Sequence, residues 1–310
     1  MEIKLDLSSC YVIMDEAVND MSELSPFISI KPNVKNYPSL LHTTNIESLQ
    51  HILCDRTFRC TSLCNPSLND PQECQRPDVS QFARSVFAAC FSHTQSEVNY
   101  FWENYGGNIK SQKVLLRFRN FARDLKSLIY TDYCFSDKFK VVAFAGNEDI
   151  IPPIAKNNDT TFDRTCYDTS NSVRTIKMFD INYVPADSDV FTRRNIERIV
   201  LTSNNANNPT KIQMTSYDVV HSLGKDKDEK WGNDTETRLE CTLLRSKFKE
   251  WECIYLRLKD EFFRGLTIVL SPYCTPAEKI NVLEIIKKSP ISDSIKESIS
   301  IVHSELQGKL

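Results

Sequence analysis

Alternation of apolar and polar positions predicts short strands and short helices that follow one another irregularly along the chain. Ile46, Leu49, Ile52 and Leu53 recur at the spacing of one helical face, whereas residues 85–91 form an apolar run of strand length. Predicted strands cover residues 39–44, 57–63, 85–91, 113–118, 139–144, 173–184, 235–244, 251–258 and 266–270. Predicted helices follow residue 44 and lie near 95–104, near 120–129, within 188–202, near 215–223 and from 275 onward.

Two of these helices start with the spacing of a capping box. Thr44 precedes Glu47 by three residues, and Thr275 precedes Glu278 in the same way. In this motif the hydroxyl and the carboxylate each accept a hydrogen bond from a free backbone N–H group. Pro276 stands at the first helical position, which favours a helix start there.

The order of these elements predicts the fold class. Few strand–helix–strand units occur, and the chain has only 7 glycines and no Gly-rich phosphate loop. We therefore predict an α+β fold with mixed, largely antiparallel sheets flanked by helices. We divide the chain into an N-terminal extension at residues 1–37, a single α+β domain at 38–288 and a C-terminal tail at 289–310.

Composition narrows the class of protein. Lys and Arg number 38 against 41 Asp and Glu, a net charge of −3, which argues against a duplex-DNA binder with a broad basic surface. No apolar run approaches the roughly 18 residues of a membrane span, and the chain start lacks the pattern of a signal peptide. The 11 cysteines include no Cys-x2-Cys pair, so we expect reduced thiols, no metal, no membrane partner and a cytoplasmic location.

The first polar segment with chemical potential is His42-Thr43-Thr44, at the end of a predicted strand. A histidine in this position can donate a hydrogen bond to a ligand hydroxyl, and the two threonines add polar contacts. The structural alternative is that Thr44 caps the next helix and His42 is a half-buried residue with its bonds satisfied.

Two further segments are candidates for ligand contact. Asn69 and Asp70 lie in a Pro-rich loop, where an ordinary turn is the alternative. Ser92 ends an apolar strand, and the aromatic residues after it could form the wall of a site for a flat ring. These aromatic residues are Tyr100, Trp102 and Tyr105. Aromatic residues at helical spacing also pack in cores, which is the alternative.

The last segment follows Trp231 and places Asp234, Glu236 and Arg238 at alternating positions. Side chains two residues apart on a strand point to the same face, so the arginine can hold both carboxylates ionised and aligned. A carboxylate held in this way can bond a ribose hydroxyl or stabilise an oxocarbenium ion during cleavage at an anomeric carbon. A solvated edge strand with a ladder of salt bridges is the alternative.

Taken together and in this order, these segments resemble a bacterial family known as domain of unknown function 2971. The family pattern is L-Y-H-Y-T, F-N-D-P-x-E, C-F-S, W-x2-Y and K-x3-W-x2-E-x-E-x-R. The matching segments are Leu41–Thr44, Leu68–Glu73, Cys90–Ser92, Trp102–Tyr105 and Lys227–Arg238. Thr43 replaces an aromatic residue of the pattern, and Asp234 replaces a glutamate.

A more distant likeness is to ADP-ribosyltransferases, in which a His or Arg grips the nicotinamide ribose and a late strand carries the catalytic Glu. This resemblance implies an ADP-ribosyltransferase-like fold with NAD as substrate. His42 would hold the ribose, Glu236 would be catalytic and Asp234 would be its partner. Tyr100, Trp102 or Tyr105 would stack on the nicotinamide ring. Arg238 would clamp a phosphate or a carboxylate.

Three hypotheses about function follow. The first is an NAD-dependent ADP-ribosyltransferase or NAD-cleaving enzyme, such as a bacterial toxin or phage-defence effector, with an unknown protein or nucleic-acid acceptor. The second is a non-catalytic module that senses a nucleotide-type small molecule or a nucleic-acid end, with cations from residues 225–230 and Arg238. The third is an interaction protein in which Asn69, Asp70 and Arg238 form a buried polar network.

Overall fold

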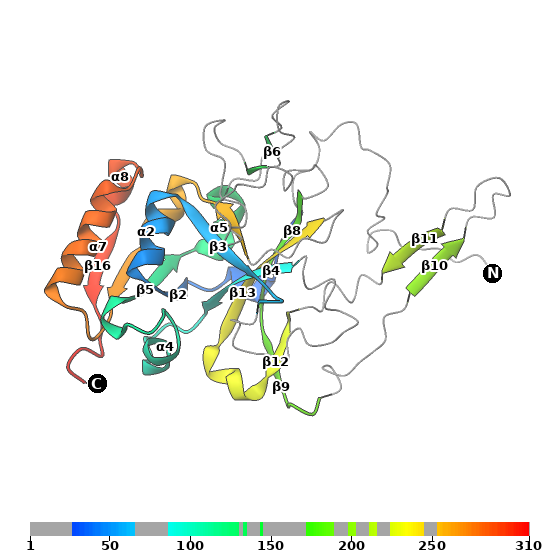
Figure 1. The fold of residues 1–310 in the computed structure, drawn as a ribbon, viewed down its shortest axis with the longest axis horizontal. Coiled ribbons are helices and arrows are strands. Elements are labelled where there is room, and N and C mark those ends of the chain that lie inside the picture. Colours follow the sequence, from blue (N-terminus) through cyan, green and yellow to red (C-terminus); the bar gives the residue numbers. More distant parts are fainter. Residues whose placement is uncertain are drawn as a thin grey trace.

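The computed structural model describes residues 27–65, 86–129, 133–134, 143–144, 172–188, 198–202, 211–215, 224–244 and 253–309. Its main feature is a sheet of ten strands with helices on both faces (Figure 1). The strands are β1 (Phe27–Ile30), β2 (Ser39–Asn45), β3 (Thr57–Ser62), β4 (Val86–Ser92), β5 (Lys113–Arg119), β8 (Ser172–Asp180), β13 (Glu236–Leu244), β14 (Cys253–Arg257), β15 (Thr267–Leu270) and β16 (Ser300–His303).

The strand order is β1-β8-β13-β4-β2-β5-β15-β16, and β3 pairs with both β4 and β14. Only the two outermost pairs of this path, β1 with β8 and β15 with β16, are parallel. Three smaller pairs are β6 (Tyr133–Cys134) with β7 (Ala143–Phe144), β9 (Asn182–Val184) with β12 (Asp226–Asp228), and β10 (Arg198–Thr202) with β11 (Lys211–Thr215). The predicted α+β class, with a mixed and mostly antiparallel sheet, is therefore confirmed.

Helices fall on both faces of the main sheet. The α-helices are α1 (Pro32–Lys35), α2 (Ile46–Cys54), α4 (Asn99–Asn104), α5 (Phe121–Leu128), α7 (Pro276–Lys288) and α8 (Asp293–Lys296). The 3-10 helices of the described residues are η2 (Lys110–Gln112), η5 (Glu229–Asp234) and η6 (Asp260–Phe263). Apolar residues of α2, α5, α7 and α8 share the large core with one face, and α4 covers a smaller cluster on the other.

Alternation along β2 and β5 explains the two clusters. Leu40 and Leu116 point into the large core, and their neighbours Leu41 and Leu115 point toward α4. Successive strand residues face opposite sides, so the two strands are buried on both faces. Burial on both faces explains why apolar residues stand next to one another in these strands, at Leu40-Leu41 and at Val114-Leu115-Leu116.

The helix starts confirm one predicted cap and correct the other. Thr275 and Glu278 form the expected capping box at the start of α7. At the start of α2, however, the side chain of Asn45 accepts the hydrogen bond from the backbone N–H of Ser48 at 2.8 Å. Asparagine is as good a cap as threonine, and β2 continues through Thr44, so the helix begins one residue later than predicted.

The sheet extends past both expected domain boundaries. β1 lies in the predicted N-terminal extension and pairs with β8, while β16 lies in the predicted C-terminal tail and pairs with β15. The predicted helix within 188–202 is wrong at its end, because residues 198–202 form β10. The predicted helix near 215–223 falls outside the described residues, apart from Thr215 at the end of β11.

Two strands, β2 and β3, pair with different parts of the same edge of β4 and diverge between these parts. We call this divergence the fork, and it positions the site. β2 meets β4 only where Leu41 pairs with Ser92, and β3 meets it where Thr61 and Ser62 pair with Ala88 and Phe87. Among the strands that the structure describes, none pairs with the segment of β4 between these contacts on this edge. Its other edge is paired with β13 along its whole length, Val86–Ser92.

Candidate functional site

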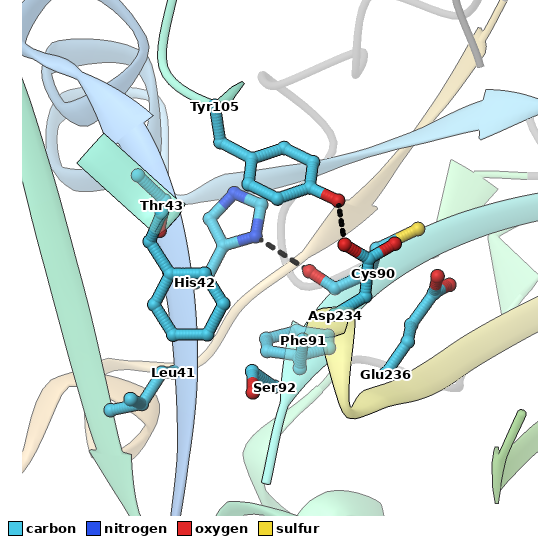
Figure 2. Close-up of a pocket in the computed structure, with 10 residues that line it drawn as sticks. Leu41, His42, Thr43, Cys90, Phe91, Ser92, Tyr105, Asp234 and Glu236 are labelled. Carbon is cyan, nitrogen blue, oxygen red and sulfur yellow. Dashed lines mark hydrogen bonds between the residues drawn. The ribbon is translucent and has the colours of Figure 1, made fainter. Parts of the chain in front are cut away.

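A cavity of about 100 Å³ opens at this fork (Figure 2). Of the candidates from the sequence, His42, Thr43, Ser92, Tyr105, Asp234 and Glu236 line it. Leu41, Cys90, Phe91 and Phe101 complete the wall. The fold therefore brings together side chains from β2, β4, the end of α4 and the start of β13, which lie up to 195 residues apart in the chain (236 − 41).

His42 occupies the gap between the diverging strands. Its Nδ1 atom lies 2.9 Å from the carbonyl oxygen of Cys90, so the side chain hydrogen-bonds the backbone of β4 where no described strand pairs with this edge. A carbonyl only accepts hydrogen bonds, so Nδ1 carries the proton. The imidazole packs against the rings of Phe58 and Phe91, with centroids at 4.8 and 5.5 Å. Burial lowers the pKa of His42, so its Nε2 atom is an unprotonated acceptor at neutral pH.

Glu236 is a buried carboxylate of the pocket wall and is only 3% exposed. One carboxylate oxygen accepts from Lys227 Nζ at 2.6 Å and the other from Arg238 Nε at 2.8 Å. Burial raises the pKa of this carboxyl group, but the charges of Arg238 and Lys227 outweigh burial and lower it to about 2. Glu236 is therefore an ionised carboxylate at every physiological pH.

The sequence predicts that Asp234 lies on the same strand as Glu236, and this prediction is wrong for Asp234. Asp234 ends the 3-10 helix η5, and Thr235 between the two carboxylates has φ 42°, in the left-handed region. A β-branched residue is strained in that conformation. The Thr235 hydroxyl is held by Ser92 Oγ at 2.6 Å and by the carbonyl of Asp234 at 2.8 Å. The strained turn aims both carboxylates at the same pocket.

Two tyrosines of the α4 segment interact with Asp234. Tyr105 donates its hydroxyl to Asp234 Oδ1 at 2.6 Å (Figure 2). Burial and the Asp234 carboxylate raise the pKa of Tyr100 to about 12. Gly106 fixes the position of Tyr105, because its φ is 79° and a Cβ atom there would lie 2.5 Å from the Thr44 carbonyl oxygen.

The predicted role of Trp102 in ring stacking is wrong. Trp102 is fully buried in the α4 cluster, and its Nε1 donates to Glu97 at 2.6 Å. Phe101 and Tyr105 lie one helical turn apart and share the face toward the pocket, whereas Trp102 points to the sheet. The structural alternative from the sequence is correct for this residue.

Arg238 does not line the pocket, so the expected phosphate clamp is also wrong. Its side chain is 0% exposed and lies behind Glu236, with Nη1 donating to the Gly224 carbonyl at 2.7 Å. Arg238 does bind a carboxylate, but this carboxylate is Glu236 of the same chain and not a ligand. Trp231 is half-buried in η5, under Lys230 Nζ at 5.7 Å from its ring centroid, and lies outside the pocket lining.

Sequence reasoning missed the role of Lys227. This lysine lies in a charged run that was expected to supply cations to a bound nucleotide or nucleic-acid end, but it is 4% exposed and contacts both Asp234, at 3.4 Å, and Glu236. The available signal was its place in the K-x3-W pattern ahead of the carboxylates. Cys90 was also missed as a lining residue; burial and the nearby Glu236 raise the pKa of its thiol, which stays protonated.

Asn69 and Asp70 fall outside the described residues, and so does the rest of their motif, Leu68–Glu73. Within the described part of the chain, no group of three or more His, Cys, Asp and Glu side chains is arranged to hold a metal ion. In the same part, no helix has the length and apolar character needed to cross a membrane.

This arrangement suits chemistry at a positively charged centre. It presents an ionised carboxylate, a neutral imidazole and aromatic walls from Phe91, Phe101 and Tyr105. A cationic ring or a developing oxocarbenium ion would be stabilised by the carboxylate in a partly dry site. No family model matches this sequence, and no curated protein and no solved structure matches it at a significant level.

Proposed function

We propose that the protein cleaves the bond between nicotinamide and ribose in NAD, as an ADP-ribosyltransferase or an NAD glycohydrolase. The observation that supports this is the ionised Glu236 at the wall of a pocket with aromatic sides. Nicotinamide in NAD is a cationic pyridinium, and the C1′ atom of its ribose becomes an oxocarbenium ion as the bond breaks. Both charges are complementary to the carboxylate.

The protonation states in the pocket favour an N-glycoside of this type. When the C1′–N1 bond breaks, the electron pair leaves with nicotinamide, which departs as a neutral molecule and needs no general acid. Glu236 has a pKa of about 2 and His42 a lowered pKa, so neither is a proton donor at neutral pH. Cleavage of an ordinary O-glycoside uses a carboxylic acid of raised pKa beside the leaving oxygen. Glu236 is ionised at neutral pH and cannot act as this acid.

Each pocket residue then has a defined task. Glu236 accepts a hydrogen bond from the ribose 2′-hydroxyl and stabilises the oxocarbenium ion. His42 accepts a hydrogen bond from a ribose hydroxyl at Nε2, and Tyr105 and Phe101 pack on the nicotinamide ring. Water or an acceptor nucleophile attacks C1′ and releases one proton, which gives ADP-ribose or an ADP-ribosylated product.

The test is nicotinamide release from NAD, followed by mass spectrometry together with ADP-ribose and modified protein or nucleic acid. Glu236→Gln keeps the side-chain volume and removes the charge, so turnover should fall at least about 100-fold. Glu236→Asp is the second variant, because it keeps the charge for Lys227 and Arg238 but withdraws the carboxylate from the pocket; a shift of about 1 Å can cost about 100-fold. Release that persists in both folded variants would overturn the proposal.

Binding without turnover is the alternative outcome. NAD that raises the melting temperature of the wild type while no nicotinamide appears would point to the sensing module. A protein that neither binds nor cleaves NAD would favour the interaction protein, in which Glu236, Arg238 and Lys227 are a structural network.

A further inference from the structure

A cross-strand row connects the pocket to an arginine on the α4 face of the sheet. Residues that pair directly in neighbouring strands point to the same face. The consecutive pairs are Glu236 with Ser92, Ser92 with Leu41, Leu41 with Arg117, Arg117 with Thr267, and Thr267 with Ser300. Glu236, Ser92 and Leu41 line the pocket, and the row continues from them to Arg117 on β5.

Arg117 lacks a partner in the described part of the chain. Its side chain is half-buried, its Nε atom is buried without a hydrogen-bond partner, and its guanidinium forms no ion pair there. A guanidinium is always charged, and a buried charged donor without an acceptor is costly. Arg119 is two residues further along the same strand face, and it is exposed. This combination is typical of a site that an anion completes.

The position of the arginine matches the phosphate end of the proposed substrate. Neighbouring strands lie about 4.8 Å apart, so Arg117 is one strand from pocket-lining Leu41 and roughly 14 Å from Glu236. The pocket, at about 100 Å³, is below the roughly 300–1,000 Å³ of a site that encloses a drug-sized ligand. It holds the nicotinamide end only, and the diphosphate on the ribose 5′ carbon must lie outside it. Leu41 and Ser92 mark the end of the pocket opposite Tyr105 (Figure 2).

We propose that Arg117, assisted by Arg119, binds the diphosphate of the dinucleotide and thereby selects NAD over substrates without phosphate. This inference rests on the proposed function and names the part of the substrate that lies outside the pocket. Arginine suits this task because its planar fork bonds two phosphate oxygens at once.

The test compares NAD with nicotinamide riboside, which has the same scissile bond but no phosphate. In Arg117→Gln, KM for NAD should rise about tenfold or more while kcat changes little. The kcat/KM for nicotinamide riboside should stay within about twofold of wild type. Arg117→Lys should recover part of the loss on NAD because it keeps the charge. Arg59→Gln, at an exposed arginine on β3 outside the row, is the control and should match wild type.

Two results would overturn the subsite, and they differ from failure of the proposed function. Unchanged KM for NAD in Arg117→Gln, or equal losses on both substrates, would show that Arg117 does not bind the diphosphate. A wild type that cleaves neither substrate would refute the proposed function instead. Calorimetry with inorganic diphosphate then decides the subsite: binding by wild type that is lost in Arg117→Gln supports it, and no binding or equal binding contradicts it.

Discussion

Glu236 and Glu240 lie four residues apart on the same face of β13, and both are buried, at 3% and 1% exposure. Two cations contact Glu236 at 2.6 and 2.8 Å, whereas Lys177 Nζ lies 3.6 Å from a Glu240 oxygen, beyond hydrogen-bonding distance. The pKa of Glu236 is lowered to about 2. Burial raises the pKa of Glu240 to about 7, against the opposing charges of Lys177 and Arg238.

The comparison shows that burial alone does not decide the charge of a carboxylate. Desolvation raises the pKa of both groups, and only cations at hydrogen-bonding distance reverse the effect at Glu236. The fold places two such cations, Lys227 and Arg238, beside Glu236 where β13 reaches the pocket. An ionised carboxylate at the pocket is therefore a property of the local network, which single substitutions can test.

Removing Lys227 should have the largest effect on stability. Lys227→Met leaves Glu236 with one cation instead of two, and breaking a buried ion pair from one side costs about 3–5 kcal/mol. Urea unfolding at pH 7 measures this loss. Lys230→Met is the matched control, because Lys230 is 54% exposed and pairs with Asp228 at the surface, so it should cost less than about 1 kcal/mol. Similar losses in both variants would mean that the buried Lys227–Glu236 pair stabilises the protein no more than a surface pair does.

Acid should destabilise the protein through Glu236. Its folded-state pKa of about 2 lies below the unfolded value of 4.5, so the unfolded state binds more protons between these two pH values. The corresponding stability, about 3 kcal/mol, is present above pH 4.5 and is lost as the pH falls toward 2. The slope of unfolding free energy against pH in this window should be smaller in Glu236→Gln. A slope equal to that of wild type would contradict the lowered pKa.

Glu240 should act in the opposite direction and in a different window. Its folded-state pKa of about 7 exceeds the unfolded value of 4.5, so the folded state binds more protons between pH 4.5 and 7. Stability should therefore fall as the pH rises through this range, by up to about 3 kcal/mol at pH 7 and above. Glu240→Gln should flatten this slope. Persistence of the slope in that variant would assign it to another group.

The smallest effect is expected at the aromatic wall. Tyr105→Phe removes the hydroxyl that donates to Asp234 and leaves the ring in place. The loss of one hydrogen bond to a charged group should cost about 1.5–3 kcal/mol when buried, and less here because Tyr105 is only half-buried. Thermal unfolding measures the change. A loss as large as that of Lys227→Met would place Tyr105 inside the charged network instead of at its border.

Local features of the fold were predictable from the sequence, because they depend on neighbouring residues. The capping box at Thr275 and Glu278 and the shared face of Glu236 and Arg238 are examples. The fork at β4 was not predictable, since it depends on which distant strands pair with the same edge.

Burial of charged residues was also beyond the sequence. Lys227 stands in a run of charges that is typical of a solvated segment, and its burial depends on carboxylates that follow it in η5 and β13. Trp102 and Tyr105 share one motif, and only the packing of α4 decides that the first belongs to the core and the second to the pocket. The place of β16 in the sheet depends on its long-range pairing with β15.

The most direct test of the central claim is the rate of nicotinamide release from NAD by Glu236→Gln relative to Glu240→Gln. Both variants replace one buried glutamate of β13 with a neutral amide of similar volume, and only the first alters the pocket. Rates are compared at pH 7 per folded molecule, with the folded fraction taken from circular dichroism. We predict that Glu240→Gln retains wild-type turnover within a few-fold and that Glu236→Gln loses at least about 100-fold. Equal turnover in the two variants would contradict a catalytic role for the ionised carboxylate.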